Sequence, residues 1–528
     1  MLSKRLPVFL IFSVLPSLLP AQAIDRDLLE VTIPQLESMY AAHRYTVTQV
    51  VRWYLARIAK YDGIYRAVCA VDAPGALATA AREDAEAARG GSGFARGPMW
   101  GVPIVIKANT SIKGLITSDG WKGFVIPGHE LTAPADATVV AKLRAAGAVI
   151  LGQTNMPDFA ASDTTRSSAF GRTGNAYDVR FSPGGSSGGT VTAVTANFAL
   201  LGTGTDTSNS IRMPSATSAV IGVLPTRGLV SIAGIAPLDW LLDDTGPIAR
   251  DVTDAAIALA VMAGEDPMDF RTAGSAGKAQ PAPYTQYLRA GALQGKRFGV
   301  PAFIVAAKSL RPETREAFLK AVDELRAAGA TVVMDDSILK GFEQAVDKIK
   351  TWPYHFEGFE TFLENFGPPQ YKSAAEYAKA VGSPLSPMIT MGGGANSPAL
   401  QSDPNSESNF FAPQREALAV YNETLDRLHL DGFVYPAAQM PPPDETMPQN
   451  GQLSSGPHSE TGWVNPIGVP AIVVVGGFYA SGLPFGLEIS ARQWKDGDLL
   501  GWAYAYEQAT HHRHPPVLVE QGLLPNAR

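Results

Sequence analysis

Three short stretches of this 528-residue chain contain side chains suited to acyl transfer. The first, residues 101–107, is an apolar run that ends in Lys107. A lysine at the end of a buried strand loses hydration, which disfavours its ammonium form and lowers its pKa. Lys107 is therefore a candidate base, whereas a lysine on a solvated face is the ordinary alternative.

The other two stretches are turns built from small residues around serines. Residues 182–190 place four glycines around Ser186 and Ser187, so the backbone can bend sharply and approach a ligand closely. An apolar run follows at once, which favours a folded turn over a flexible linker. Residues 202–214 surround Ser210 with small residues, and consecutive backbone N–H groups beside a serine are the arrangement of an oxyanion hole.

These stretches, in this order, resemble the amidase signature family of serine hydrolases. The resemblance covers most of the chain and includes the Thr-Asn-Met-Pro turn at 154–157 and the Gly-Leu-Pro-Phe-Gly-Leu motif at 482–487. It implies a role for each of seven residues: Lys107 as base, Ser186 as the serine that follows a cis peptide bond, Ser210 as nucleophile, Thr207, Ser208 and Asn209 as oxyanion-hole donors together with Ser210, and Ser187 as a hydrogen-bonding neighbour.

The chain departs from the family pattern at two positions. The family often has Gly-Gly before the nucleophile, and this chain has Ser208-Asn209. Asn tolerates positive φ better than most residues, so we expect the hole to survive with a narrower approach. The lysine is commonly followed by an acidic residue, and this chain has Ala108, which should make neutral Lys107 easier to reach.

The resemblance implies hydrolysis of a carboxylic amide through a Ser210 acyl-enzyme, with Ser186 relaying a proton to Lys107. It also implies the amidase-signature fold, an α/β architecture with a central mixed β-sheet covered by helices on both faces. We expect no cofactor and no metal, since the sequence has no nucleotide-binding fingerprint and no zinc-ligand spacing. The expected partner is a small-molecule amide, and the expected assembly is a monomer or a homodimer.

Hydrophobic periodicity places these motifs on an α/β scaffold. Residues 24–65 predict N-terminal helices, with an apolar stripe after Thr46. Downstream, helical and strand patterns alternate, which predicts a mixed sheet. The predicted elements are strands at 148–151, 297–300, 330–333, 432–435, 471–475 and 485–489, and helices at 139–146, 313–328 and 498–510.

Residues 335–455 differ in composition from the rest of the chain. They are rich in aromatic residues, Gly, Pro, Asn and Ser, and predict an insertion over the scaffold that forms the substrate region. The aromatic residues argue against a disordered linker. We expect residues 24–528 to form a single amidase domain that contains this insertion.

The N-terminus has the pattern of a secretory signal peptide over residues 1–23. Lys4 and Arg5 precede an apolar run at 6–19, and Ala21-Gln22-Ala23 is a cleavage pattern. A spanning helix needs about 20 apolar residues, so we expect export to the periplasm or the medium without stable membrane insertion. The net charge of −7, from 43 basic and 50 acidic residues with no long basic block, argues against nucleic-acid binding.

Two alternatives remain open at this point. Residues 184–188 also fit G-x-S-x-G, the nucleophile elbow of α/β-hydrolases, with Ser186 as nucleophile and His458 or His512 as base of an exported esterase. The elbow needs a preceding strand, and residues 177–182 are polar and turn-like. A non-catalytic solute-binding protein is the second alternative, although binding alone does not require three separated Lys and Ser stretches.

Overall fold

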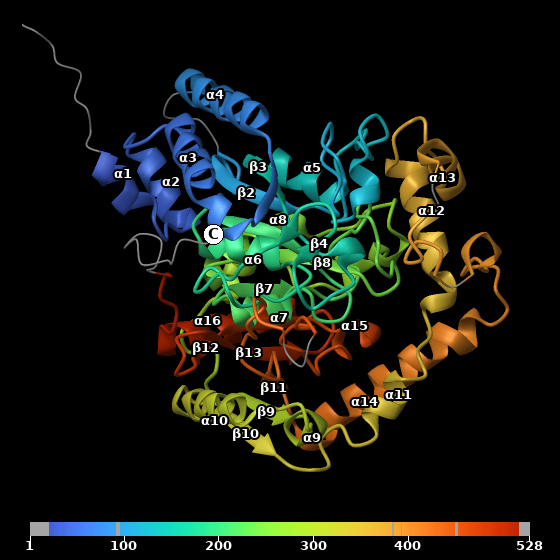
Figure 1. The fold of residues 1–528 in the computed structure, drawn as a ribbon. Coiled ribbons are helices and arrows are strands. Elements are labelled where there is room, and N and C mark those ends of the chain that lie inside the picture. The colour runs from blue at the N-terminus through green and yellow to red at the C-terminus, as the bar shows by residue number, and fades with distance from the viewer. Residues whose placement is uncertain (1–20, 91–95, 383–384, 392, 449–451, 517–528) are drawn as a thin grey trace, which may run out of the picture.

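A sheet of eleven strands runs through the computed structural model, which describes residues 21–90, 96–382, 385–391, 393–448 and 452–516 (Figure 1). The strand order is β1-β3-β2-β6-β8-β7-β12-β13-β11-β9-β10. The strands are β1 (Val68–Val71), β2 (Val102–Lys107), β3 (Ala148–Thr154), β6 (Leu201–Asp206), β7 (Ile221–Leu224), β8 (Asp244–Ala249), β9 (Arg297–Val300), β10 (Thr331–Met334), β11 (Gly432–Pro436), β12 (Ala471–Phe478) and β13 (Pro484–Ala491). A separate hairpin pairs β4 (Arg166–Ser167) with β5 (Gly171–Arg172).

The sheet is mixed, as predicted. Strand β2 runs parallel to its neighbours β3 and β6, whereas β6, β8, β7, β12 and β13 are successively antiparallel. Strands β11, β9 and β10 are parallel again. All residues of β2, β3 and β6 are buried, because helices cover the sheet around these central strands.

Helices flank the sheet, which confirms the predicted fold class (Figure 1). Helix α6 packs on β2 and β6, helix α7 on β7, β12 and β13, and helix α16 on β12 and β13. The helices are α1 (Ala21–Leu28), α2 (Ile33–Ala41), α3 (Val47–Tyr65), α4 (Ala73–Gly90), α5 (Thr138–Ala145), α6 (Gly188–Thr195), α7 (Arg212–Thr217), α8 (Val252–Met262), α9 (Ala302–Ala306), α10 (Pro312–Ala327), α11 (Phe342–Val346), α12 (His355–Phe366), α13 (Ala374–Val381), α14 (Ala412–Leu428), α15 (Val464–Ile467) and α16 (Asp496–Thr510).

The N-terminal helices form where the sequence predicts them. Thr32 and Thr46 each cap a helix through a capping box, with Gln35 and Gln49 as the reciprocal partners. The predicted signal peptide lies outside the described residues up to position 20, and Ala21–Ala23 begin helix α1. No helix among the described residues is both long enough and apolar enough to cross a membrane.

The segment 335–455 contains more regular structure than its composition predicts. Helices α11 to α14 form an arm along one side of the molecule, and strand β11 then enters the central sheet (Figure 1). The rings of Phe359 and Phe362 on α12 pack in a cluster with Phe124 of the scaffold. The segment therefore does not lie wholly outside the scaffold, and its role as the substrate region stays a prediction.

Candidate active site

Lys107 ends the buried strand β2 and its side chain is fully enclosed. Its Nζ atom lies 2.7 Å from Ser186 Oγ, 3.1 Å from Ser187 Oγ and 2.8 Å from Thr205 Oγ1. These oxygens belong to neutral hydroxyl groups, and within the described residues no ion pair joins the amine to a carboxylate. The structure thus brings together three residues that the sequence assigned to one site.

Burial lowers the pKa of Lys107 from its ordinary value of 10.5 to about 7. Loss of hydration is the largest cause, and three carboxylates, of which Asp119 has the largest effect, oppose it. A substantial fraction of the amine is therefore neutral at neutral pH. This is the property that the sequence pattern predicted for a basic lysine.

Asp119 is a carboxylate near Lys107 that the sequence analysis missed. Its backbone N–H donates to the carbonyl of Ala108 at 3.1 Å, which places it beside the end of β2. Within the described part of the chain, neither carboxyl oxygen has a hydrogen-bond partner, and burial raises the pKa of Asp119 well above its usual range. Ala108 supplies no carboxylate, but Asp119 acts on Lys107 from another loop, and the pKa of Lys107 is lowered in spite of it.

The Ser186 turn is tightly packed, which explains its glycines. The Gly185-Ser186 peptide bond is cis, and Gly184 has a φ of +79°. A Cβ atom on Gly185 would lie 2.5 Å from the carbonyl oxygen of Ser162, so a larger residue there would collide with that loop. Ser186 and Ser187 are both fully buried, and helix α6 begins directly after them.

Ser210 lies in the turn between β6 and α7, and its carbonyl accepts a hydrogen bond from Ser187 N–H at 3.2 Å. This bond fixes the two serine turns against each other. Asp206 Oδ2 accepts the N–H groups of Ile211 and Arg212. In the described part of the chain, by contrast, the N–H groups of residues 207–210 donate to no protein acceptor, so they are available to a substrate oxyanion.

The backbone of the nucleophile turn does not require glycine. Among the described residues with positive φ there is none between positions 207 and 210. The expectation that Asn209 replaces a glycine by tolerating positive φ is therefore wrong. Instead, the Asn209 side chain donates to Asp163 Oδ1 at 3.1 Å, and Ser208 packs against Gly462.

Arg212 holds the nucleophile turn to the far end of the chain. Its guanidinium is fully buried, contacts Asp206 and Glu488, and donates to the carbonyl of Ser208 and to Asn465 Oδ1. The sequence shows Asp206 and Arg212 as neighbouring charges. It gives no signal for Glu488, which comes from β13, because that contact depends on the sheet order.

Ser210 opens onto a cavity of about 440 Å³, a volume in the range of small-molecule sites. The predicted oxyanion-hole residues Thr207, Ser208 and Asn209 line it with Ser210. Lys107, Ser186 and Ser187 do not line it, because they are fully buried. The remaining lining residues were not predicted in this role: Ala160, Ala161, Ser162, Asp163, Leu238, Ser455 and His458.

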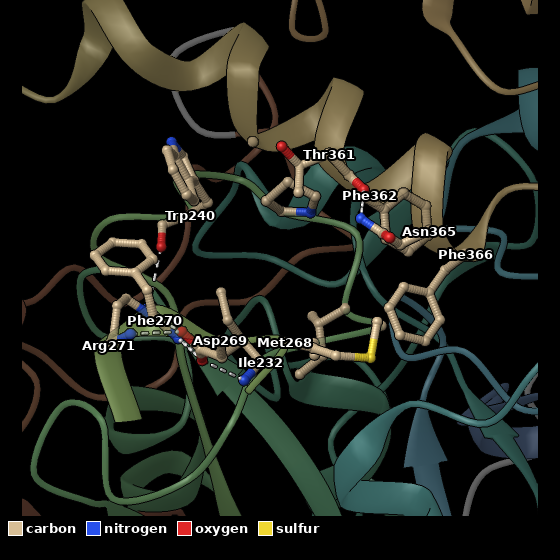
Figure 2. Close-up of a pocket in the computed structure, with 15 residues that line it drawn as sticks. Ile232, Trp240, Met268, Asp269, Phe270, Arg271, Thr361, Phe362, Asn365 and Phe366 are labelled. Atoms are coloured by element: carbon tan, nitrogen blue, oxygen red, sulfur yellow. Dashed lines mark hydrogen bonds and ion pairs between the residues drawn. The ribbon is translucent and has the colours of Figure 1, made fainter. Parts of the chain in front are cut away.

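A second, apolar cavity of about 80 Å³ lies between α12 and the loop that carries Trp240 (Figure 2). Phe362 and Phe366 of segment 335–455 line it together with Trp240 and Phe270. Of that segment, among described residues, only Ser455 lines the Ser210 cavity. Leu238 lines the Ser210 cavity, whereas Pro237 and Trp240 of the same loop line the apolar cavity.

The elbow hypothesis does not fit the surroundings of Ser186. The described residues 173–185 contain turns, bends and one isolated bridge, and no strand leads into the turn. Ser186 is buried against Lys107, whereas an elbow serine is exposed. The two histidines proposed as base have other partners: His458 hydrogen-bonds Ser455, and His512 hydrogen-bonds Glu324. Separately, the described residues contain no group of three side chains that could hold a metal ion.

Comparisons with known proteins point to one family. The family model described as Amidase matches residues 49–500. One subunit of the glutamyl-tRNA(Gln) amidotransferase of Gloeobacter violaceus is 32% identical over 93% of this chain and 99% of its own length. The structure of native peptide amidase from Stenotrophomonas maltophilia superposes with a TM-score of 0.78 at 30% identity, covering 92% of this chain and 98% of that one. These matches overturn the α/β-hydrolase hypothesis and favour an enzyme over a solute-binding protein. The chain belongs to the amidase family.

Proposed function

We propose that this protein hydrolyses a carboxylic amide through an acyl-enzyme on Ser210, with Ser186 as proton relay and Lys107 as base. The observation that supports this most is the 2.7 Å contact between Lys107 Nζ and Ser186 Oγ, next to Ser187, whose N–H donates to the Ser210 carbonyl. A lysine with a pKa of about 7 is suited to accept and return a proton at neutral pH.

The reaction has two steps, acylation and deacylation, and each step returns the relay to its starting protonation state. Ser210 Oγ bonds to the amide carbon while its proton passes to Ser186, and Ser186 gives its own proton to neutral Lys107. The C–N bond then breaks, and the same relay returns a proton to the departing nitrogen. Water attacks the ester carbon in the second step, again with proton transfer through Ser186, and the acid leaves Ser210 free.

The free N–H groups of residues 207–210 stabilise the oxyanion of each tetrahedral intermediate. One such donor is worth roughly 3–4 kcal/mol of barrier. Arg212 keeps this turn in place from behind, since it contacts Asp206 and the Ser208 carbonyl without facing the cavity. The turn therefore needs no reorganisation when charge develops.

The names of the relatives suggest two settings for this chemistry. A protein named peptide amidase is consistent with an enzyme that acts on free amides, which we favour. The relative named as a subunit of a glutamyl-tRNA(Gln) amidotransferase suggests instead an amide transfer in which other protein chains take part. The predicted signal peptide supports export to the periplasm or the medium, and hence the first setting, with the protein as a monomer or homodimer.

A substrate panel with matched variants tests the proposal. Purified protein without residues 1–23 should hydrolyse aryl, alkyl or peptide amides, and glutamine should be a poor substrate. Lys107→Ala and Ser210→Ala should abolish this activity, whereas the exposed controls Lys308→Ala and Ser402→Ala should retain it. Full activity in Ser210→Ala, or no hydrolysis of any amide by folded protein, would overturn the proposal.

A further inference from the structure

Asp163 provides the single carboxylate among the described residues that line the Ser210 cavity. No lysine or arginine accompanies it there, and His458 is the other ionisable lining residue. The side chain of Asp163 is 28% exposed, so it remains accessible from the cavity. Its position beside the proposed nucleophile makes it a candidate for substrate recognition.

The negative charge of Asp163 is poorly compensated within the protein. Asn209 Nδ2 donates a neutral hydrogen bond to Oδ1 at 3.1 Å. His458 Nδ1 lies 3.9 Å from Oδ2, beyond hydrogen-bond distance, and its ring is 52% exposed. Partial burial raises the pKa of Asp163, and Asp206 acts in the same direction. His458 and Asn209 oppose this rise, and a cation hydrogen-bonded to Oδ2 would supply a closer counter-charge than the imidazole does.

The carboxylate is held in a fixed position relative to the serine turns. Thr165 Oγ1 donates to the carbonyl of Gly184 at 2.8 Å, which ties the Asp163 loop to the Ser186 turn. Gly185 and Gly456 enclose the same loop, since a Cβ on either would lie within 2.8 Å of an Asp163 backbone atom. A group bound by Asp163 is therefore positioned against the reacting carbonyl.

The other carboxylates near the site already have partners or lie away from the cavity. Asp206 is paired with Arg212, and Asp243 accepts from Thr207 and from two backbone N–H groups. Asp119 is fully buried and does not line the cavity. Among the described residues that line the cavity, Asp163 is the one carboxylate, and its possible charged partner there is the half-exposed imidazole of His458 at 3.9 Å.

We propose that Asp163 binds a primary ammonium group of the substrate, so that preferred amides carry a free amino group a few bonds from the scissile carbonyl. This inference rests on the proposed function, in that the Ser210 cavity is the substrate site. The ammonium can belong to the acyl part or to the departing amine, and both sources present the same chemistry to Asp163. The gain comes from a charge-assisted hydrogen bond in a partly desolvated site.

Two isosteric substrate pairs test the inference. Alanine p-nitroanilide and isobutyryl p-nitroanilide differ by an ammonium or a methyl group on the acyl part. N-(2-aminoethyl)acetamide and N-propylacetamide differ likewise on the leaving amine. The expected result is a kcat/KM at least about tenfold higher for the ammonium member of one pair, and the responding pair identifies which part of the substrate carries the cation.

Asp163→Asn is the matched variant, because its amide oxygen can still accept from Asn209. It should lower kcat/KM about tenfold or more for the ammonium substrate and leave the methyl isostere within about twofold. Equal losses on both members would assign Asp163 a structural role and overturn the inference. The absence of any ammonium preference in the unmodified enzyme would also overturn it while leaving the proposed amidase function intact.

A binding measurement separates this inference from the proposed mechanism. In the Ser210→Ala protein, calorimetry should detect tighter binding of the ammonium member than of the methyl member in at least one of two pairs, alaninamide with isobutyramide and N-(2-aminoethyl)acetamide with N-propylacetamide. Asp163→Asn should remove that difference. Equal affinities within both pairs would contradict the ammonium site whatever the nucleophile is. If the difference persists but Ser210→Ala retains full hydrolysis, the mechanism fails and the ammonium site stands.

Discussion

Lys107 Nζ lies 2.7 Å from Ser186 Oγ, and both side chains are fully buried. The contact joins the end of strand β2 to the turn before helix α6, two parts of the chain that are far apart in sequence. Because the amine has only uncharged acceptors in direct contact, its protonation depends on burial and on more distant carboxylates. Several measurable properties follow from this relationship.

The rate of acylation should depend on a group with a pKa of about 7. Protonated Lys107 cannot accept a proton, so kcat/KM should fall as the pH drops below about 7 and level off above about 8. A pH–rate profile with a non-ionising amide substrate measures this dependence. A flat profile from pH 5.5 to pH 8 would contradict the role of Lys107 as base.

Removal of the carboxylate at Asp119 should move this profile. Asp119 raises the pKa of Lys107, so Asp119→Asn should shift the acid limb to lower pH by about half a unit or more. Asp323 is exposed, so Asp323→Asn is a control for the loss of one negative charge and should not shift the acid limb of the pH–rate profile. A shift in the opposite direction would show that Asp119 does not favour the ammonium form.

Lys107 should also make stability depend on pH. Its pKa is about 7 in the folded state and near 10.5 in the unfolded chain, so the unfolded state binds more protons between these values. The free energy of unfolding should therefore rise with pH in this window, by up to about 1.4 kcal/mol per pH unit from this group. Lys107→Met lacks this contribution.

Urea unfolding of both proteins at pH 7.5 and pH 9.5 measures the effect. The gain of the unmodified protein between these pH values should exceed that of Lys107→Met. Equal gains in the two proteins would mean that Lys107 keeps an ordinary pKa when folded.

Arg212 should contribute more to stability than an exposed arginine. Arg212→Met leaves the buried carboxylates of Asp206 and Glu488 without their cation, at a cost of about 3–5 kcal/mol. The matched control Arg180→Met breaks a pair in which the arginine is 55% exposed, and should cost less than about 1 kcal/mol. Similar losses from the two substitutions would argue against Arg212 as the anchor of the nucleophile turn.

Local patterns predicted most of the scaffold, because short-range spacing determines which segments are helices and strands. The strand predicted at 297–300 coincides with β9, and the apolar run before Lys107 is the buried strand β2. Helix α12 was not predicted, although the aromatic residues at 359, 362 and 366 have helical spacing. The composition of that segment favoured loops and obscured this signal.

The sequence predicted the serines and the lysine of the site, but it did not predict the carboxylates around them. The three stretches have recognisable local patterns, whereas Asp119, Asp163 and Glu488 reach the site through loops and strands that are distant in sequence. A lone aspartate in a loop has no periodicity or spacing that marks it. The packing of the Gly185 turn places Asp163, the strand order places Glu488, and the hydrogen bond to Ala108 places Asp119.

The most direct test of the account is the identity of the serine that reacts with a fluorophosphonate. Ser186 and Ser210 lie on one tryptic peptide, residues 181–212, so fragment-ion mass spectrometry must assign the adduct. If Ser210 is the nucleophile, a single adduct forms on Ser210, is lost in Ser210→Ala and forms much more slowly in Lys107→Ala. An adduct on Ser186, or labelling that persists in folded Ser210→Ala, would contradict it.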